Sequence, residues 1–190
     1  MPYEWQNPLG PMEPRSYVCG YCGNRVGPNM GWWTKNTNPQ ARIYLCSFCG
    51  KPTFFDVMGK QYPGLPFGDD VASVPADVGA LYAEARFCMT VNSSTSAVLT
   101  CRKLLMHIAV EKGAPTGKSF LEYVEYLADK HYVPPDGMGW VDQIRKKGNE
   151  ANHEIKIMSS DDAKDLIEFS EMLLKFVYEF PAKVKPPATT

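Results

Sequence analysis

"CGYCGN" at residues 19–24 and "CSFCGK" at residues 46–51 are two copies of one pattern, Cys-x-x-Cys-Gly. The two-residue gap lets both thiolates of a tight turn face one point, and the glycine that follows permits the backbone to turn. Two such turns supply the closed tetrahedral shell of four sulfurs that structural zinc prefers. The predicted zinc ligands are Cys19, Cys22, Cys46 and Cys49.

We expect the metal to stabilise the fold of a segment that is too small to form a hydrophobic core of its own. This predicts a zinc ribbon over residues 17–55. Short strands such as "IYL" at residues 43–45 suit a ribbon. A redox dithiol, two disulfides and an iron–sulfur site are the alternatives, and neither pair opens a helix as a redox motif would. Four aromatic residues near the cysteines either stack on bases or form the small core of the ribbon. These aromatic residues are Tyr21, Trp32, Trp33 and Phe48.

The composition of the 190 residues is that of an ordinary globular protein, with 44% hydrophobic residues and a formal net charge of -1. This charge argues against a generally basic nucleic-acid coat protein, so any nucleic-acid contact requires a local patch. The chain contains no apolar run of the roughly 18 residues that a membrane span needs. Its first residues lack the pattern of a signal peptide, so we expect a cytoplasmic protein with no membrane contact.

Glycine and proline interrupt residues 56–75, which predicts a linker, and helical periodicity begins after it. The expected helices cover residues 76–91, 94–113, 119–131, 138 into the 145–154 stretch, and 160–180. Ser159 and Asp162 predict a capping box for the last helix, and Pro181 is expected to end it. The sequence thus predicts a mainly α fold, with a helical bundle over residues 76–182 and a disordered tail over residues 183–190.

The stretch "RKKGNEANHE" at residues 145–154 concentrates polar chemistry on the fourth expected helix. Arg145, Asn149 and His153 follow at steps of four residues, so a continuous helix places them along one stripe. An imidazole can move a proton at neutral pH, and a guanidinium can neutralise a phosphate. Alternatively, the Gly-Asn pair ends the helix, the lysines are solvated, and His153 is a structural histidine.

The order of "AVLTCRKLLMHIAVEKG", "LEYVEYLADK", "IRKKGNEANHE" and "SSDDAKDLIEFSEMLLKFVYE" resembles a bacterial domain of unknown function in the HEPN superfamily. This resemblance covers residues 76–182 and implies an up-and-down helical bundle that forms a homodimer, often in prokaryotic or phage defence. Many HEPN proteins are metal-independent ribonucleases that use an arginine and a histidine from both subunits. Others are non-catalytic and bind nucleotides, RNA or a partner protein.

The sequence departs from the nuclease pattern, since Gly148 stands where that motif has its arginine and seven residues separate Arg145 from His153. The resemblance carries over to Asn149 and His153, whereas Lys147 lacks the guanidinium fork. We therefore expect recognition of RNA or a nucleotide, or regulation of a partner protein. The expected ligand contacts are Arg102, Lys146 and Lys147. The alternatives are a metal-independent endoribonuclease, with His153, Arg145 and Asn149 as catalytic residues of a homodimer, and a protein-interaction scaffold.

Overall fold

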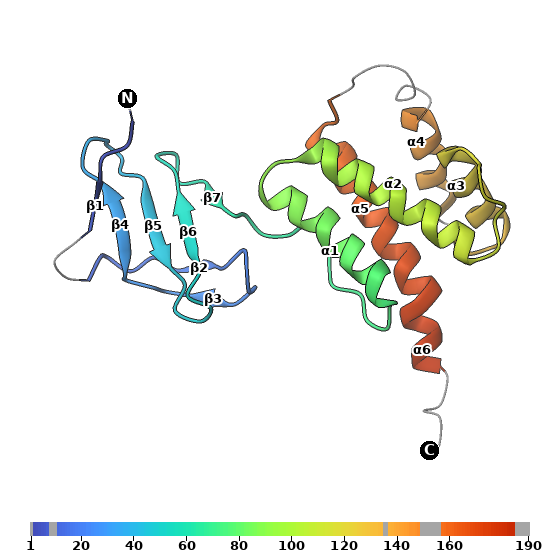
Figure 1. Cartoon of the computed structure of the whole chain (residues 1–190), viewed down its shortest axis with the longest axis horizontal. Helices are drawn as coiled ribbons and strands as arrows, with labels where there is room; N and C mark the ends of the chain where they lie inside the picture. The colour runs from blue at the N-terminus through green and yellow to red at the C-terminus, as the bar shows by residue number, and fades with distance from the viewer. Residues whose placement is uncertain (1, 8–10, 135–136, 149–156, 185–190) are drawn as a thin grey trace. The chain divides into compact units, whose positions relative to one another are not determined.

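The structure is a computed structural model that describes residues 2–7, 11–134, 137–148 and 157–184, without the side chains of residues 145–148. The chain divides into two compact units, Met1–Pro66 and Phe67–Thr190. We call them the β unit and the helical unit (Figure 1). No helix in the described ranges is long and apolar enough to cross a membrane.

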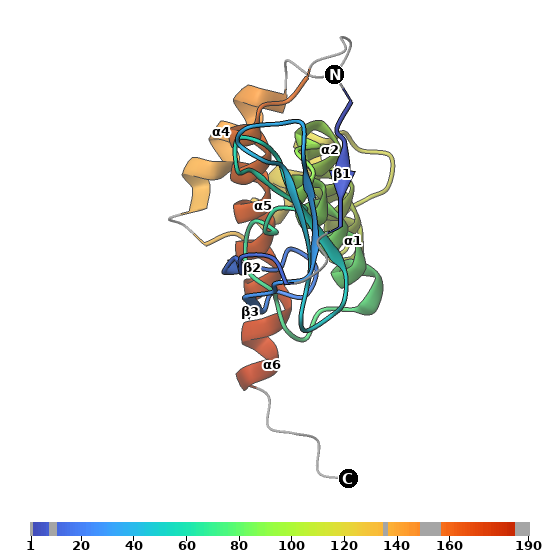
Figure 2. The same cartoon turned by 90° about the vertical axis from the view of Figure 1, so that its left-hand side faces the viewer.

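The β unit contains two antiparallel sheets. The strands are β1 (Trp5–Gln6), β2 (Tyr17–Val18), β3 (Arg25–Val26), β4 (Gly31–Thr34), β5 (Arg42–Leu45), β6 (Pro52–Phe55) and β7 (Gln61–Tyr62). One sheet has the order β1-β4-β5-β6-β7, and β2 pairs with β3 in the other. Figures 1 and 2 show the β2–β3 pair at one end of the larger sheet.

The prediction of a mainly α fold with only a small ribbon is wrong, because the described residues of the β unit form seven strands. Each strand is only two to four residues long, so the two-residue alternation that marks a strand has no room to develop in the sequence. β1 precedes the cysteines and pairs with β4, with Trp5 opposite Thr34. The correct description is an antiparallel β unit followed by a helical unit.

The core of the β unit lies on one face of the larger sheet. Tyr44 and Phe55 are buried there and contact the ring of Tyr17, which comes from β2. Successive residues of a strand point to opposite faces, so the neighbours of these residues point away from the core. The core face therefore joins the small sheet, through Tyr17, to the larger one.

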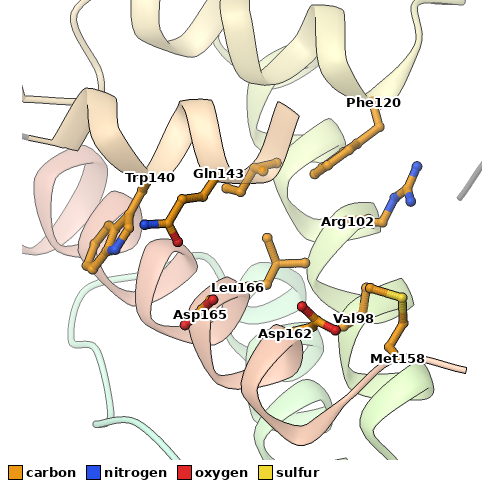
Figure 3. Close-up of a pocket in the computed structure, with 10 residues that line it drawn as sticks. Val98, Arg102, Phe120, Trp140, Gln143, Met158, Asp162, Asp165 and Leu166 are labelled. Atoms are coloured by element: carbon orange, nitrogen blue, oxygen red, sulfur yellow. The ribbon is translucent and has the colours of Figure 1, made fainter. Parts of the chain in front are cut away.

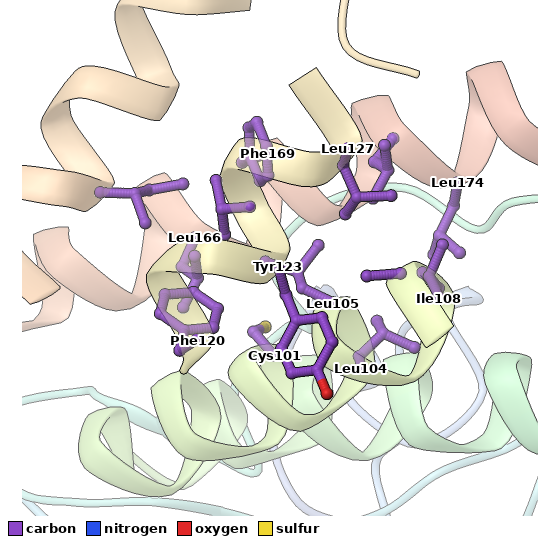
Figure 4. Close-up of a cluster of buried hydrophobic side chains, with 14 of the residues drawn as sticks. Cys101, Leu104, Leu105, Ile108, Phe120, Tyr123, Leu127, Leu166, Phe169 and Leu174 are labelled. Atoms are coloured by element: carbon purple, nitrogen blue, oxygen red, sulfur yellow. The ribbon is translucent and has the colours of Figure 1, made fainter. Parts of the chain in front are cut away.

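The helical unit consists of helices packed around α2. They are α1 (Ala76–Thr90), α2 (Ser94–Glu111), α3 (Phe120–Asp129), α4 (Met138–Gly148), α5 (Ser160–Leu174), the π-helix η2 (Lys175–Glu179) and α6 (Phe180–Val184). α2 packs against α1, α3 and α5. The core between them includes Leu104, Leu105 and Phe169, all fully buried, and Figure 4 shows Cys101 among these side chains.

Helix ends follow local chemistry. The predicted capping box of α5 is confirmed, since Ser159 Oγ accepts from the Asp162 N–H at 3.1 Å. Ser119 and Glu122 form a second capping box, at the start of α3. The prediction that Pro181 ends the last helix is wrong, because the helical backbone continues from η2 into α6, which contains Pro181.

The stretch that follows Pro66 is tied to α1. Arg86 donates hydrogen bonds to the carbonyl oxygens of Phe67 at 3.0 Å and Gly68 at 2.7 Å, and it pairs with Asp70. Tyr82 donates to the Asp69 carbonyl oxygen at 3.1 Å. These contacts make residues 67–70 part of the helical unit.

Candidate functional site

The four predicted ligand residues come together in the β unit. Their sulfur atoms all lie within 4.8 Å of one another. Cys19 Sγ lies 3.8 Å from Cys49 Sγ, and Cys22 Sγ lies 3.9 Å from Cys46 Sγ. A disulfide needs an S–S distance of about 2.05 Å, so all four cysteines are free. The arrangement can hold one metal ion between the two turns.

The two turns have almost the same backbone geometry. In the first, the Gly23 N–H donates to the Cys19 carbonyl at 2.8 Å, and in the second Gly50 donates to Cys46 at 2.9 Å. Gly23 and Gly50 have φ angles of 70° and 71°, in the left-handed region that favours glycine. This confirms the expectation that the glycine after each pair makes the turn.

The thiols of the cluster differ in pKa because their surroundings differ. The backbone N–H of Asn24 lowers the pKa of Cys22 to about 7. Burial opposes ionisation of Cys46, but backbone N–H groups of Cys49 and Phe48 outweigh it and lower its pKa. The Lys51 N–H favours the thiolate of Cys49, whereas burial and the other three sulfurs raise its pKa to about 11. The cluster thus resists carrying several negative charges at once, a repulsion that a bound cation relieves.

The site connects the two sheets of the β unit. Cys19 directly follows β2, and Cys46 directly follows β5. Both residues are buried in the same cluster as Tyr17, Tyr44 and Phe55. Gly20 is required here, because a Cβ atom at this position would lie 2.3 Å from the carbonyl oxygen of Gly64. A metal ion at this place would bind the small sheet to the larger one.

The four aromatic residues near the cysteines do not share one role. Trp33 packs against the core of the β unit. Trp32 is half-buried, whereas Tyr21 is 41% exposed and Phe48 is 72% exposed. Lys51 lies above the ring of Tyr21, with 5.0 Å between Nζ and the ring centroid. Only Trp33 therefore fits the expectation of a small core.

The helical unit has a pocket between α2, α3, α4 and α5 (Figure 3). Its lining residues are Val98, Arg102, Phe120, Trp140, Gln143, Ile144, Met158, Asp162, Asp165 and Leu166. The sequence predicts Asp162 only as part of a helix cap, and it does not indicate a pocket. No local pattern marks such a site, because its walls come from four separate helices.

Arg102 is the one predicted ligand contact whose side chain the structure describes. Its guanidinium lies over the ring of Phe120, 4.5 Å from the centroid. Burial lowers the pKa of this guanidinium. Arg102 therefore makes a cation–π contact and forms part of the pocket wall.

The structure describes less of the other predicted residues. The backbone of Arg145, Lys146 and Lys147 belongs to α4, which contributes Trp140, Gln143 and Ile144 to the pocket. Asn149 and His153 lie outside the described residues, as do the side chains of the three cations. The proposed stripe from Arg145 to His153 therefore stays a prediction.

The two remaining cysteines, Cys88 and Cys101, belong to the helical unit and not to the candidate metal centre. Cys101 is fully buried in the core, and burial raises the pKa of its thiol to about 12. Cys88 is half-buried and packs at the edge of the same core, where burial also raises its pKa. Both residues serve packing.

The fold and the site define a class of protein with two units: a β unit in which four cysteine sulfurs lie close enough to hold a metal ion, and a helical unit with a pocket lined in part by a helix that carries three cations. The family model described as "Domain of unknown function (DUF4145)" matches residues 83–188, which is more than half of the chain. The chain belongs to this family. Comparisons with curated proteins and with solved structures gave no significant match.

Proposed function

We propose that the four cysteines bind a structural zinc ion. A tetrahedral site with Zn–S bonds of about 2.3 Å has sulfur–sulfur edges of about 3.8 Å. The distances between Cys19 and Cys49 and between Cys22 and Cys46 are 3.8 and 3.9 Å. Four thiolates fill the coordination shell of zinc and leave no position for a substrate. The ion holds the two sheets of the β unit together and takes no part in chemistry.

We also propose that the helical unit is HEPN-like and recognises RNA or a nucleotide in the pocket between α2, α3, α4 and α5. The observation that carries this proposal is the position of Arg102, in the wall of a pocket that α4 also lines. α4 continues into Arg145, Lys146 and Lys147, so the helix that lines the pocket also carries three consecutive cations. Arg102 and the α4 residues are far apart in the sequence, and the fold brings them to the same pocket.

The chemistry of the lining suits a nucleotide. Phe120 and Trp140 offer aromatic rings on which a base can stack. Arg102 supplies a guanidinium for a phosphate group, and Asp165 supplies a carboxylate that can accept from an exocyclic amino group. The mixture of one cation with carboxylates favours a ligand that carries both an anionic part and amino donors.

The variant Arg102→Gln tests whether the pocket is the binding site. Its matched control is Lys103→Gln, which also removes one positive charge, but from an exposed neighbouring residue on α2. The probes are AMP, GMP and a short single-stranded RNA, and isothermal titration measures their binding. We expect Arg102→Gln to weaken binding about tenfold, because it removes a charge-assisted hydrogen bond. Equal affinity in both variants would refute the pocket as the site.

Catalysis, pairing with a second copy and a role in defence stay predictions from the resemblance. Catalysis requires His153, which lies outside the described residues.

A further inference from the structure

The five-stranded sheet has a second face, opposite the core. Across the sheet, Trp32 lies opposite Ile43, and Ile43 lies opposite Phe54. Phe54 in turn lies opposite Tyr62. Directly paired residues point to the same side of a sheet. One row of side chains therefore runs across β4, β5, β6 and β7 on the face that does not contain Tyr44 and Phe55.

Trp5 belongs to the same face, because it pairs with Thr34, which is two residues from Trp32. The ring of Trp5 lies 6.0 Å from that of Phe54, and the ring of Tyr3 lies within 6.2 Å of both. Phe54 and Tyr62 stack at 5.9 Å with 27° between their planes. We call this surface the aromatic face, formed by Tyr3, Trp5, Trp32, Ile43, Phe54 and Tyr62.

None of these six residues is buried, and Tyr3 and Trp5 are 40% and 38% exposed. An antiparallel sheet with one face on its core normally presents polar side chains on the other face. The aromatic face instead offers five rings, and four of them are in contact with one another. Such a face is suited to a ligand that is itself flat and apolar on its surface.

The positive charge of the β unit favours an anionic ligand for the aromatic face. Residues 1–66 contain six Lys and Arg against three Asp and Glu, whereas the remainder of the chain is acidic. Lys60 lies above the ring of Tyr62, with 5.3 Å between Nζ and the ring centroid. Aromatic platforms beside cations bind single-stranded nucleic acid, because bases stack on the rings while the cations attract the phosphates. Four strands at about 4.8 Å spacing give a platform about 14 Å wide, enough for two or three bases.

We propose that the aromatic face of the β unit binds single-stranded RNA by base stacking. This inference rests on the proposed function only for the class of ligand, and it places a second contact outside the helical pocket. Stacking on this face does not depend on base identity, since every base has a flat face. The β unit then binds single-stranded RNA with little preference for its base sequence.

The test uses the full, zinc-loaded chain and a fluorescein-labelled oligomer of twelve uridines. In the double variant Trp5→Leu/Phe54→Leu, apolar side chains remain while two rings are lost. We expect its Kd to rise about tenfold or more, with an unchanged slope of log Kd against log salt concentration, because no charge is removed. The matched control is Phe48→Leu, which removes a 72% exposed ring that lies outside the aromatic face.

Unchanged zinc content and circular dichroism in the double variant show that the β unit is still folded. Wild-type affinity in that variant, or no binding of the oligomer by the wild type, would overturn the proposal. A change in oligomeric state at unchanged RNA affinity would also overturn it, and would make the face a protein contact. AMP separates the two sites: the inference stands if Trp5→Leu/Phe54→Leu loses affinity for the oligomer but binds AMP as the wild type does, whether or not Arg102→Gln weakens AMP binding.

Discussion

Cys22 and Cys49 show how single residues respond to the same cluster of sulfurs. The pKa of Cys22 is lowered to about 7, chiefly by the backbone N–H of Asn24. Cys49 receives the N–H of Lys51, yet burial and its three sulfur neighbours raise its pKa to about 11. The difference arises from position in the cluster, since both residues end a Cys-x-x-Cys pair.

Replacement of one ligand should release the metal. We expect Cys46→Ser to lower the zinc content from roughly one ion per chain to a small fraction, because a serine hydroxyl stays protonated and binds zinc poorly. Cys88→Ser is the matched control, since Cys88 lies in α1, outside the site. Mass spectrometry of the metal in purified protein measures the result. Full zinc content in Cys46→Ser would contradict a four-thiolate site.

Gly31 allows β4 and β5 to approach each other. A Cβ atom at this position would lie 1.8 Å from the carbonyl oxygen of Ile43, which is backbone and has no room to move aside. We expect Gly31→Ala to destabilise the β unit by about 3 kcal/mol or more. Gly27→Ala should change stability by less than about 0.5 kcal/mol, since a Cβ atom there meets nothing within 4 Å. Urea unfolding, followed by tryptophan emission, compares the two variants.

Among the elements, α3 depends on its capping box for a defined start. Ser119 Oγ accepts from the Glu122 N–H at 3.3 Å, and the Glu122 carboxylate accepts from the Ser119 N–H at 2.8 Å. The hydrogen bond from the Ser119 backbone, followed by those from its side chain and from Lys118, lowers the pKa of Glu122 to about 2. The ionised carboxylate is therefore part of the helix start.

This shift predicts how the contribution of the capping box varies with pH. The pKa of Glu122 is lower in the folded state than its ordinary value of 4.5, so its stabilising effect is full above pH 4.5. The effect is lost as the pH falls from 4.5 towards 2. The stability difference between wild type and Glu122→Gln should therefore vanish near pH 2. Glu125→Gln, on the same helix but outside the capping box, is the control, and a pH-independent difference for Glu122→Gln would contradict the mechanism.

For the molecule as a whole, the important fact is that each unit has its own core. Tyr44, Phe55 and the buried cysteines form the core of the β unit. A separate cluster that includes Leu104, Leu105 and Phe169 forms the core of the helical unit. The candidate metal centre lies in the first cluster only. The loss of metal should therefore affect one unit selectively.

Treatment with a chelator should unfold the β unit and leave the helices in place. We expect the signal at 222 nm to persist, while the emission of the tryptophans of the β unit moves to longer wavelength as the core against which Trp33 packs opens. Circular dichroism and fluorescence of the same sample measure the two effects, with Trp140→Phe to remove the tryptophan of the helical unit. Loss of helix together with the metal would show that the units do not fold independently.

A cleavage assay separates recognition from catalysis. Wild type and His153→Ala are incubated with structured and single-stranded RNA in the presence of EDTA, and the zinc content is measured afterwards. We expect no cleavage by either protein, because Gly148 stands where the nuclease motif has its arginine. Cleavage by the wild type alone would instead show an endoribonuclease that uses His153.

The sequence by itself determined the features that depend on neighbouring residues. Both Cys-x-x-Cys-Gly turns, the start of α1 at Ala76 and the capping box at Ser159 follow from short patterns. The box at Ser119 was equally visible in the sequence as "SFLE", but we did not predict it. These features are predictable because their hydrogen bonds close within one turn of the chain.

Only the tertiary structure decided which distant residues meet. The fold class was predicted wrongly because the pairing of β1 with β4 joins residues far apart in the sequence, and strands of two residues leave no periodic signal. The same holds for the aromatic face, which exists only once the strand register is set, and for the pocket that brings Arg102 together with Trp140. Contacts of this kind depend on how elements pack, and no short pattern in the sequence encodes that packing.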